Sequence, residues 1–240
     1  MKSDAPKVLH EVCGRPMLAW VLSTCLEAGC DRLLVVVGHK AESVSAEFAE
    51  MDWPIEWVRQ SPQLGTGHAV MVCRDHLADL SGPVLVIAGD GPLIEAETLR
   101  QLIETHQQEQ AACTLATSIL PDPGAYGRIL RDEAGRLVGI VEHIDADQRQ
   151  RQINEVNVSL YCFEAACLRE VIGQIDNDNA KGEYYITDAL GLLKSQGKKI
   201  AAVAAVPPED VISINTPEEL QTVDRIMAKR LQRSGERVDA

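Results

Sequence analysis

The sequence predicts an α/β sandwich with a mostly parallel β-sheet and a small antiparallel region inserted before the last helices. Short apolar runs, such as residues 33–37, alternate with longer segments of helical periodicity in the first half of the chain, which is the order of β-α-β units. These runs are apolar throughout, as expected for strands that are covered on both faces. From Gly127 onward, extended runs follow one another across short turns, which is typical of antiparallel pairing.

The elements are predicted in chain order from these patterns. The first helix covers residues 16–28, with Pro16 at its start and Gly29 after its end. The strands expected in the first half are 33–37, 55–58, 84–88 and 113–119, and the helices between them are 41–50, 67–80 and 95–109. The later segments are extended runs at 128–131, 137–141 and 156–163, a hairpin turn at 132–135, helices at 164–174 and 184–196, a strand at 200–206 and a helix at 217–231.

Composition narrows the class of protein. The chain has 240 residues, of which 45% are hydrophobic and 25% charged, so it can bury a full core. Its formal net charge of −13 and its scattered Lys and Arg residues argue against nucleic acid or an anionic membrane as a partner. No apolar run approaches the roughly 20 residues of a transmembrane helix. Whether the chain forms a homo-oligomer stays open.

Cysteine usage indicates the compartment. The seven cysteines lack C-x-x-C spacing, and Cys25, Cys73, Cys113 and Cys162 lie among apolar neighbours. This pattern favours buried thiols in a reducing cytoplasm over disulfides or a zinc site. We therefore expect a cytoplasmic protein.

The first candidate site is a glycine-rich turn. Gln60 is followed by Gly65, Thr66 and Gly67 between a predicted strand and a predicted helix. A turn of this kind presents backbone N–H groups and the positive end of a helix dipole, which suits a phosphate or the polar edge of a base. Alone, the motif fits a tight βα turn with a Thr66 cap better. The ligand interpretation needs other such turns at the same edge of the sheet.

Two further residues suggest a metal site at strand ends. Asp90 follows the apolar run 84–88, where open α/β sheets bind ligands, and a carboxylate there suits Mg²⁺. A cap for the next helix is an equally good interpretation of Asp90. Thr216, with Pro217 and Glu219 after it, has the pattern of a helix start. Asn215, immediately before it, places an amide oxygen at a strand end and could be the second metal ligand.

The third group consists of Gly127, Glu142 and Asn157. Each lies at one end of an extended run. Such polar groups could bind the hydroxyls of a sugar. Taken singly, each fits the ordinary polarity of an edge strand better.

Taken together and in order, these segments resemble the uridylyltransferase half of the bacterial bifunctional N-acetylglucosamine-1-phosphate uridyltransferases. The resemblance extends from residue 1 to about residue 230. The segments that carry it are residues 2–10, 14–17, 63–69, 89–90, 126–128, 140–143 and 182–188, and Asn215. It implies a Rossmann-like, glycosyltransferase-A type fold over residues 1–232, followed by a polar tail at 233–240. It also implies that UTP and N-acetylglucosamine 1-phosphate react to give UDP-N-acetylglucosamine and pyrophosphate for cell-wall precursor synthesis.

The resemblance also implies roles for individual residues. Lys7 would be the catalytic lysine that contacts the triphosphate; Gln60, Gly65 and Thr66 would bind uridine; Asp90 and Asn215 would bind Mg²⁺; Gly127, Glu142 and Asn157 would contact the amino sugar. In-line attack by the sugar phosphate on the α-phosphorus requires positioning and charge neutralisation rather than a covalent nucleophile.

Several departures from the family bear on activity. The family begins with a strand and a Gly-x-Gly-Thr-Arg loop, and this sequence starts after them and lacks the hexapeptide repeats of the acetyltransferase half. We therefore expect a sheet without one central strand, poor folding and little activity. Ala88, Gly91 and the pair Val158 and Ser159 replace the residues usual in the family. The alternatives are an inactive nucleotide-sugar-binding domain or fragment, and a pyrophosphorylase for another sugar phosphate.

Overall fold

The main sheet has six strands in this computed structural model, which describes residues 5–179 and 181–234. The order β10-β6-β9-β7-β8 forms the path of the sheet, and β5 pairs with β9 beside β7. The bounds are β5 (Pro83–Ile87), β6 (Cys113–Ile119), β7 (Arg128–Arg131), β8 (Leu137–Val141), β9 (Glu155–Glu164) and β10 (Ile200–Val203). Two smaller sheets are the parallel pair β3 (Leu33–Val37) and β4 (Ile55–Arg59) and the hairpin β1 (Glu11–Val12) and β2 (Arg15–Pro16).

Strand directions agree with the predicted fold class and correct one detail of it. Both β5 and β6 run antiparallel to β9, and β10 is parallel to β6, so β5, β6 and β10 share one direction. The expected antiparallel segment 156–163 is β9, which we expected in a separate inserted region. It lies instead between β5 and β6 in the main sheet, because its apolar residues pair with both neighbours. The hairpin β7–β8 extends the same sheet.

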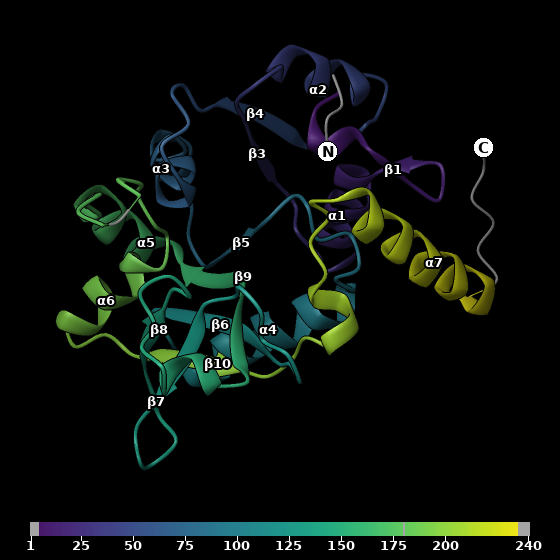
Figure 1. The fold of residues 1–240 in the computed structure, drawn as a ribbon. Coiled ribbons are helices and arrows are strands. Elements are labelled where there is room, and N and C mark those ends of the chain that lie inside the picture. Colours follow the sequence, from purple (N-terminus) through teal and green to yellow (C-terminus); the bar gives the residue numbers. More distant parts are fainter. Residues whose placement is uncertain (1–4, 180, 235–240) are drawn as a thin grey trace.

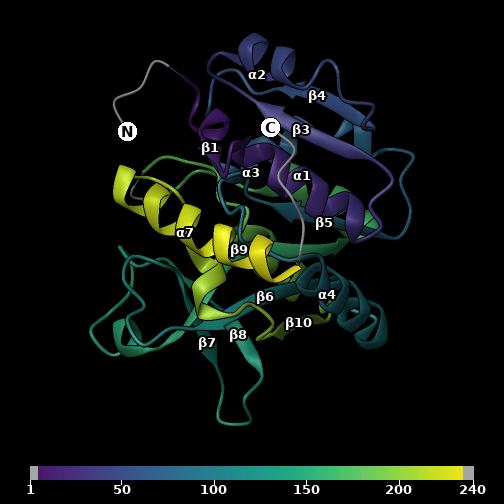
Figure 2. The same cartoon turned by 90° about the vertical axis from the view of Figure 1, so that its right-hand side faces the viewer.

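Helices cover both faces of the sheet (Figures 1 and 2). One apolar cluster joins α1 and α4 to the strands, and a second joins α3, α5 and α6 to them. A third holds α7 against the β1–β2 hairpin. The helices are α1 (Met17–Glu27), α2 (Ala41–Glu47), α3 (Thr66–Met71), α4 (Ala96–Glu109), α5 (Ala165–Val171), α6 (Asp188–Ser195) and α7 (Pro217–Ser234). Short 3-10 turns lie at Lys7–Leu9, Asp75–Leu77, Gln150–Gln152, Ile172–Gln174 and Pro208–Val211.

The strands β3 and β5 each have one unpaired edge. Within the described residues, β3 pairs with β4 alone and β5 pairs with β9 alone. Side chains of β3 and β5 contribute to the same two apolar clusters, one on the α1 side and one on the α3 side. Val84–Ile87 is apolar, yet each of its residues keeps part of its surface exposed. The unpaired edges of β3 and β5 therefore lie between the same two helical layers.

Several predicted elements end earlier than expected. The helix expected at 67–80 stops at Met71 and is followed by a 3-10 turn. Within and just after this turn, Arg32 and Arg169 donate hydrogen bonds to the carbonyl oxygens of His76, Leu77 and Leu80. The hairpin β1–β2 was not predicted. Its turn residues Cys13 and Gly14 both have positive φ, as in a type I′ turn.

Other predictions are confirmed, or concern residues outside the described ranges. All seven cysteines are free, and Cys25, Cys73, Cys113 and Cys162 are buried as predicted. No helix within residues 5–179 and 181–234 is long and apolar enough to cross a membrane. The helix expected to end at residue 231 continues to residue 234. Residues 235–240 of the predicted polar tail, and residues 1–4, lie outside the described residues.

Candidate active site

Three predicted residues meet at the carboxyl end of β5. Asp90 follows this strand, and its Oδ2 lies 2.6 Å from the Nζ of Lys7. The same Nζ lies 2.6 Å from Oδ1 of Asn215. The backbone N–H of Ile214 also donates to the carbonyl oxygen of Asp90. Residues separated by up to 208 positions in the sequence therefore form one corner, which we call the cation corner: Lys7, Asp90 and Asn215.

Local structure explains how Asn215 and Asp90 are placed. Thr216 and Glu219 form a capping box: Glu219 Oε2 accepts from the N–H of Thr216 at 2.8 Å, and Thr216 Oγ1 accepts from the N–H of Glu219 at 3.2 Å. Glu219 also accepts from the N–H of Asn215 at 2.6 Å. The predicted helix start is thus confirmed. The alternative role of Asp90 as a helix cap is not seen, since α4 starts after Glu95 without a side-chain cap.

The donor set of the cation corner fits a divalent ion that prefers oxygen. The ammonium of Lys7 is a cation held between two side-chain oxygens, and so marks a position that a metal ion could take. No group of three or more His, Cys, Asp or Glu residues able to hold a metal occurs in the described part of the chain. An ion here would therefore take further ligands from water and substrate phosphates, as Mg²⁺ commonly does.

The glycine-rich turn is held by a segment distant in sequence. Gly65 has a φ of +105° and precedes α3. The N–H of Gly67 donates to the carbonyl oxygen of Tyr184 at 2.7 Å, and the N–H of Tyr184 donates to that of Leu64 at 2.8 Å. A Cβ atom on Gly65 would lie 2.6 Å from the Tyr184 oxygen. Close packing against residues 183–186 therefore requires glycine at this turn.

The side chains predicted to bind uridine also hold the turn together. Gln60 is 7% exposed, and its amide nitrogen lies 3.0 Å from the carbonyl oxygen of Gly65 and 3.1 Å from Nδ1 of His68. Thr66 Oγ1 accepts from the N–H of Ile186 at 3.1 Å. The interpretation of Thr66 as a helix cap is wrong, because the N-cap of α3 is Gly65 and no side chain caps it. The N–H groups of Tyr184 and Ile186 bond to Leu64 and Thr66. The helix α6, which we expected to start at residue 184, therefore starts at Asp188.

The three predicted sugar-contact residues also lie together. A Cβ atom on Gly127 would lie 3.4 Å from Oε2 of Glu142, and the N–H of Asn157 donates to the Gly127 carbonyl oxygen at 2.9 Å. Burial raises the pKa of Glu142, an effect that the ammonium of Lys181 opposes. We call Gly127, Glu142 and Asn157 the sugar corner. Because Leu160 of β9 pairs with Ile87 of β5, this corner lies at the same sheet edge as Asp90.

Asn157 has structural partners in addition to its predicted role. Asn157 is 5% exposed. Its Nδ2 donates to Oη of Tyr161 at 2.7 Å, and its Oδ1 accepts from the N–H of Ser159 at 3.2 Å. Ser159 has a φ of +56° at an irregularity of β9. Left-handed backbone is costly for serine, so the bulge beside the sugar corner is strained.

We expect Ser159→Gly to stabilise the protein. Relief of the left-handed strain is worth roughly 1–2 kcal/mol, and the greater freedom of glycine in the unfolded chain removes about 0.4–1 kcal/mol of that gain. A net gain near 0.5–1 kcal/mol corresponds to about 2–3 °C in melting temperature. Thermal unfolding should show this rise. The control Ser195→Gly, at the last residue of α6, removes a hydroxyl that donates to the carbonyl oxygen of Leu192 and should destabilise. A loss of stability at both positions would contradict the assignment.

Arg128 and Tyr126 contribute to the site in ways that the sequence did not reveal. The guanidinium of Arg128 is almost fully buried and donates to the carbonyl oxygens of Tyr126, Gly124 and Arg151. Tyr126 Oη donates to the carbonyl oxygen of Val211 at 2.8 Å. These bonds fix the loop that carries Gly127. The only signal in the sequence was the Tyr-Gly-Arg motif at the start of an extended run.

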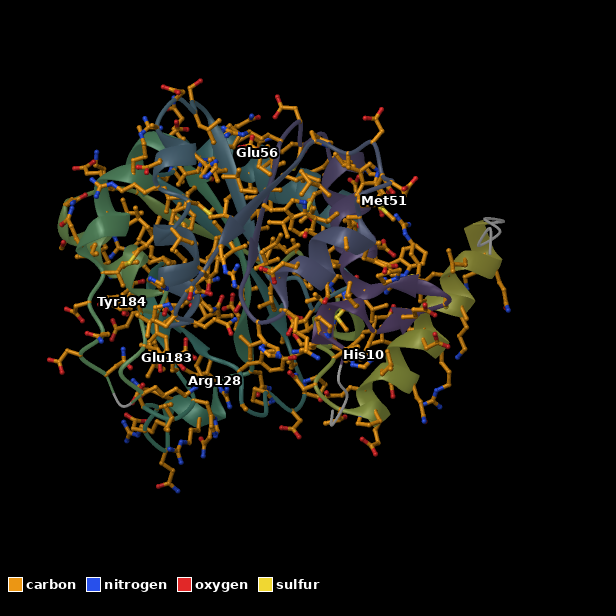
Figure 3. The ribbon with its side chains drawn as sticks, turned by 90° about the horizontal axis from the view of Figure 1, so that it is seen from above. His10, Met51, Glu56, Arg128, Glu183 and Tyr184 are labelled. Atoms are coloured by element: carbon orange, nitrogen blue, oxygen red, sulfur yellow. The ribbon has the colours of Figure 1, made fainter. Side chains whose placement is uncertain are left out.

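The arrangement of the edge can be followed from above. In Figure 3, Glu183, Tyr184 and Arg128 lie toward one side of the molecule, and His10 lies on the other side beside α7. A cavity of about 540 Å³ borders the sugar corner through Glu142 and is also lined by Tyr185. Lys7, Asp90 and Asn215 are not among its lining residues, so it adjoins the sugar corner alone.

The sequence matches a known protein family and named bacterial proteins. The family model of the MobA-like NTP transferase domain matches residues 1–157. A protein of Caldanaerobacter subterraneus subsp. tengcongensis named Bifunctional protein GlmU is 43% identical over 231 residues, covering 96% of this chain and 50% of that protein. The Bacillus subtilis protein of the same name is 39% identical over 233 residues, covering 97% and 50%. The chain thus spans about half the length of the curated relatives it matches.

Solved structures share the fold. A UDP-glucose pyrophosphorylase complexed with UDP-glucose superposes with a TM-score of 0.72 at 17% identity, covering 94% of this chain and 91% of that chain. An apo UDP-glucose pyrophosphorylase also gives a TM-score of 0.72. The predicted α/β nucleotidyltransferase fold is thereby confirmed.

Proposed function

We propose, from the premise that this chain belongs to the MobA-like NTP transferase domain family and resembles one half of the GlmU proteins, that it forms UDP-N-acetylglucosamine and pyrophosphate from UTP and N-acetylglucosamine 1-phosphate. The observation that carries the proposal is the meeting of Lys7, Asp90 and Asn215 at one corner. The sugar corner at the same edge supports it. We further propose that the chain acts in the cytoplasm in the supply of cell-wall precursors.

The residues of the cation corner would each have a role in the proposed reaction. Asp90 and Asn215 would hold Mg²⁺, which neutralises charge on the phosphates when bound. Lys7 would add a positive charge close to the triphosphate. A phosphate oxygen of the sugar phosphate attacks the α-phosphorus of UTP. The bond between the α-phosphorus and the oxygen that bridges it to the β-phosphorus breaks, and pyrophosphate leaves. Since the attacking oxygen is already anionic, the residues need to orient it rather than remove a proton.

Recognition would come from the remaining residues. The backbone groups of Gly65 and Thr66, together with Gln60, would recognise uracil by hydrogen bonds. Gly127, Glu142 and Asn157 would contact the amino sugar. Ala88, Gly91 and Ser159 replace residues usual in the related uridyltransferases, so glucose 1-phosphate is the comparison substrate for sugar specificity.

We expect UTP to be used at least about 10²-fold more efficiently than CTP or ATP, judged by kcat/KM. A site that hydrogen-bonds one base leaves its buried polar groups unpaired with another base, and this penalty sets the preference. Pyrophosphate release with each nucleotide and N-acetylglucosamine 1-phosphate measures it. Equal use of the three nucleotides would mean that the turn at Gly65 has a structural role only.

The unpaired edges of β3 and β5 favour one alternative for the 240-residue chain, namely a nucleotide-sugar-binding domain without turnover. Calorimetric binding of UDP-N-acetylglucosamine without product formation would support this alternative. Product formation would exclude it.

A further inference from the structure

Lys7 bonds to the two residues predicted to hold the metal ion. Its Nζ is 2.6 Å from Asp90 Oδ2 and 2.6 Å from Asn215 Oδ1. Both distances are short, as expected for hydrogen bonds from a charged donor. The ammonium thus already supplies a positive charge to the oxygens that would otherwise attract a divalent ion.

A divalent ion and this ammonium compete for the same oxygens. Mg²⁺ binds oxygen at about 2.0–2.1 Å. If both cations kept the same two oxygen partners, the ion would lie no more than about 4.7 Å from Nζ, given the 2.6 Å hydrogen bonds. Repulsion between charges of +2 and +1 at that separation weakens ion binding by a factor on the order of 10, even at the dielectric constant of water. The ammonium must therefore move for the ion to bind well.

The position of Lys7 allows that movement. It begins a three-residue 3-10 turn, and its side chain keeps 38% of its surface exposed. A long side chain at this exposed position can rotate away without loss of core packing. The Asp90 carbonyl accepts from the N–H of Ile214, and the N–H of Asn215 donates to the Glu219 carboxylate, so the backbone at both residues is held independently of Lys7.

We propose that Lys7 and the divalent ion exchange places at the cation corner. Without nucleotide, the ammonium occupies the oxygens of Asp90 and Asn215 and keeps the ion from binding there. When a nucleoside triphosphate arrives with its ion, the phosphate oxygens offer new acceptors to the displaced ammonium. Ion and nucleotide therefore load together. This inference rests on the metal site of the proposed function.

The test measures Mn²⁺ binding to the nucleotide-free chain, by the electron paramagnetic resonance signal of the free ion. Lys7→Met removes the charge while keeping a side chain of similar length, and should tighten Mn²⁺ binding about tenfold. Lys7→Arg keeps a cation and should leave binding weak. Lys198→Met is the matched control: it removes the same charge from the exposed pair with Glu170, at 3.6 Å, and should leave Mn²⁺ affinity unchanged. Circular dichroism verifies that each variant is folded.

The outcomes separate the exchange from the metal site itself. Tighter binding in Lys7→Met that is lost when Asp90→Asn is added supports the exchange. Equal, Asp90-dependent binding in the wild type and Lys7→Met overturns the exchange and leaves the metal site standing. An equal gain in Lys198→Met overturns it too, because net charge then accounts for the effect. Mn²⁺ binding that never depends on Asp90 overturns the metal site, and the exchange with it.

Discussion

Asp90→Ala should lower the rate of nucleotidyl transfer about 10²-fold or more at saturating Mg²⁺. Asp90 is the one carboxylate of the cation corner, where it lies beside Lys7 and Asn215. Its loss removes the negatively charged ligand of the ion that neutralises the phosphates, and several kcal/mol of transition-state stabilisation disappear with it. The measurement is UDP-sugar formation from UTP and N-acetylglucosamine 1-phosphate.

The control for this variant is a carboxylate away from the edge. Glu97 lies on the exposed face of α4 and pairs only with Arg100 among the ion pairs described, so Glu97→Ala should keep nearly the full rate. If the 240-residue chain turns over too slowly, both variants are compared in the extended chain discussed next. Near wild-type turnover of Asp90→Ala, at saturating or at limiting Mg²⁺, would leave Asp90 without a catalytic role.

Adding about 10–15 residues ahead of residue 1, enough for one strand and one glycine-rich turn, should raise the melting temperature by about 5–10 °C and produce readily measured activity. The reason lies in the unpaired edges of β3 and β5, whose backbone N–H and C=O groups could pair with a strand placed between them. The added strand would also cover the partly exposed residues Val84–Ile87. The turn would add backbone donors for the triphosphate.

The same extension with proline at the centre of its strand is the matched control. Proline removes one ladder donor and disfavours a central strand, so most of the gain should vanish. Thermal unfolding and UDP-sugar formation are followed side by side for the three chains. If the 240-residue chain already melts cooperatively and turns over as fast as the extended one, the unpaired edges have no functional cost.

The predictable parts of the fold were those decided locally. The apolar runs Leu33–Val37 and Cys113–Ile119 became β3 and β6 with the expected bounds, because turns delimit both. The place of β9 between β5 and β6 was not predictable, because pairing depends on residues some 40 to 80 positions apart.

The candidate site shows the same division. The position of Asp90 after a strand and the capping pattern after Asn215 could be read from the sequence, and the resemblance joined them to Lys7. The sequence did not predict that Lys7 contacts both residues or that Thr66 bonds to Ile186. Such contacts depend on how loops from different parts of the chain meet. The roles of all nine site residues stay predictions: Lys7, Gln60, Gly65, Thr66, Asp90, Gly127, Glu142, Asn157 and Asn215.

Residues 183–188 contact two parts of the edge. At one end, Tyr184 and Ile186 hydrogen-bond to the turn at Leu64–Gly67. At the other end, Tyr185 and Asp188 border the same cavity as Glu142. A shift of this segment that alters both ends would couple binding at one end to binding at the other, and linkage would make that coupling reciprocal. If base and sugar bind at these ends, each sets the affinity of the other by the same factor.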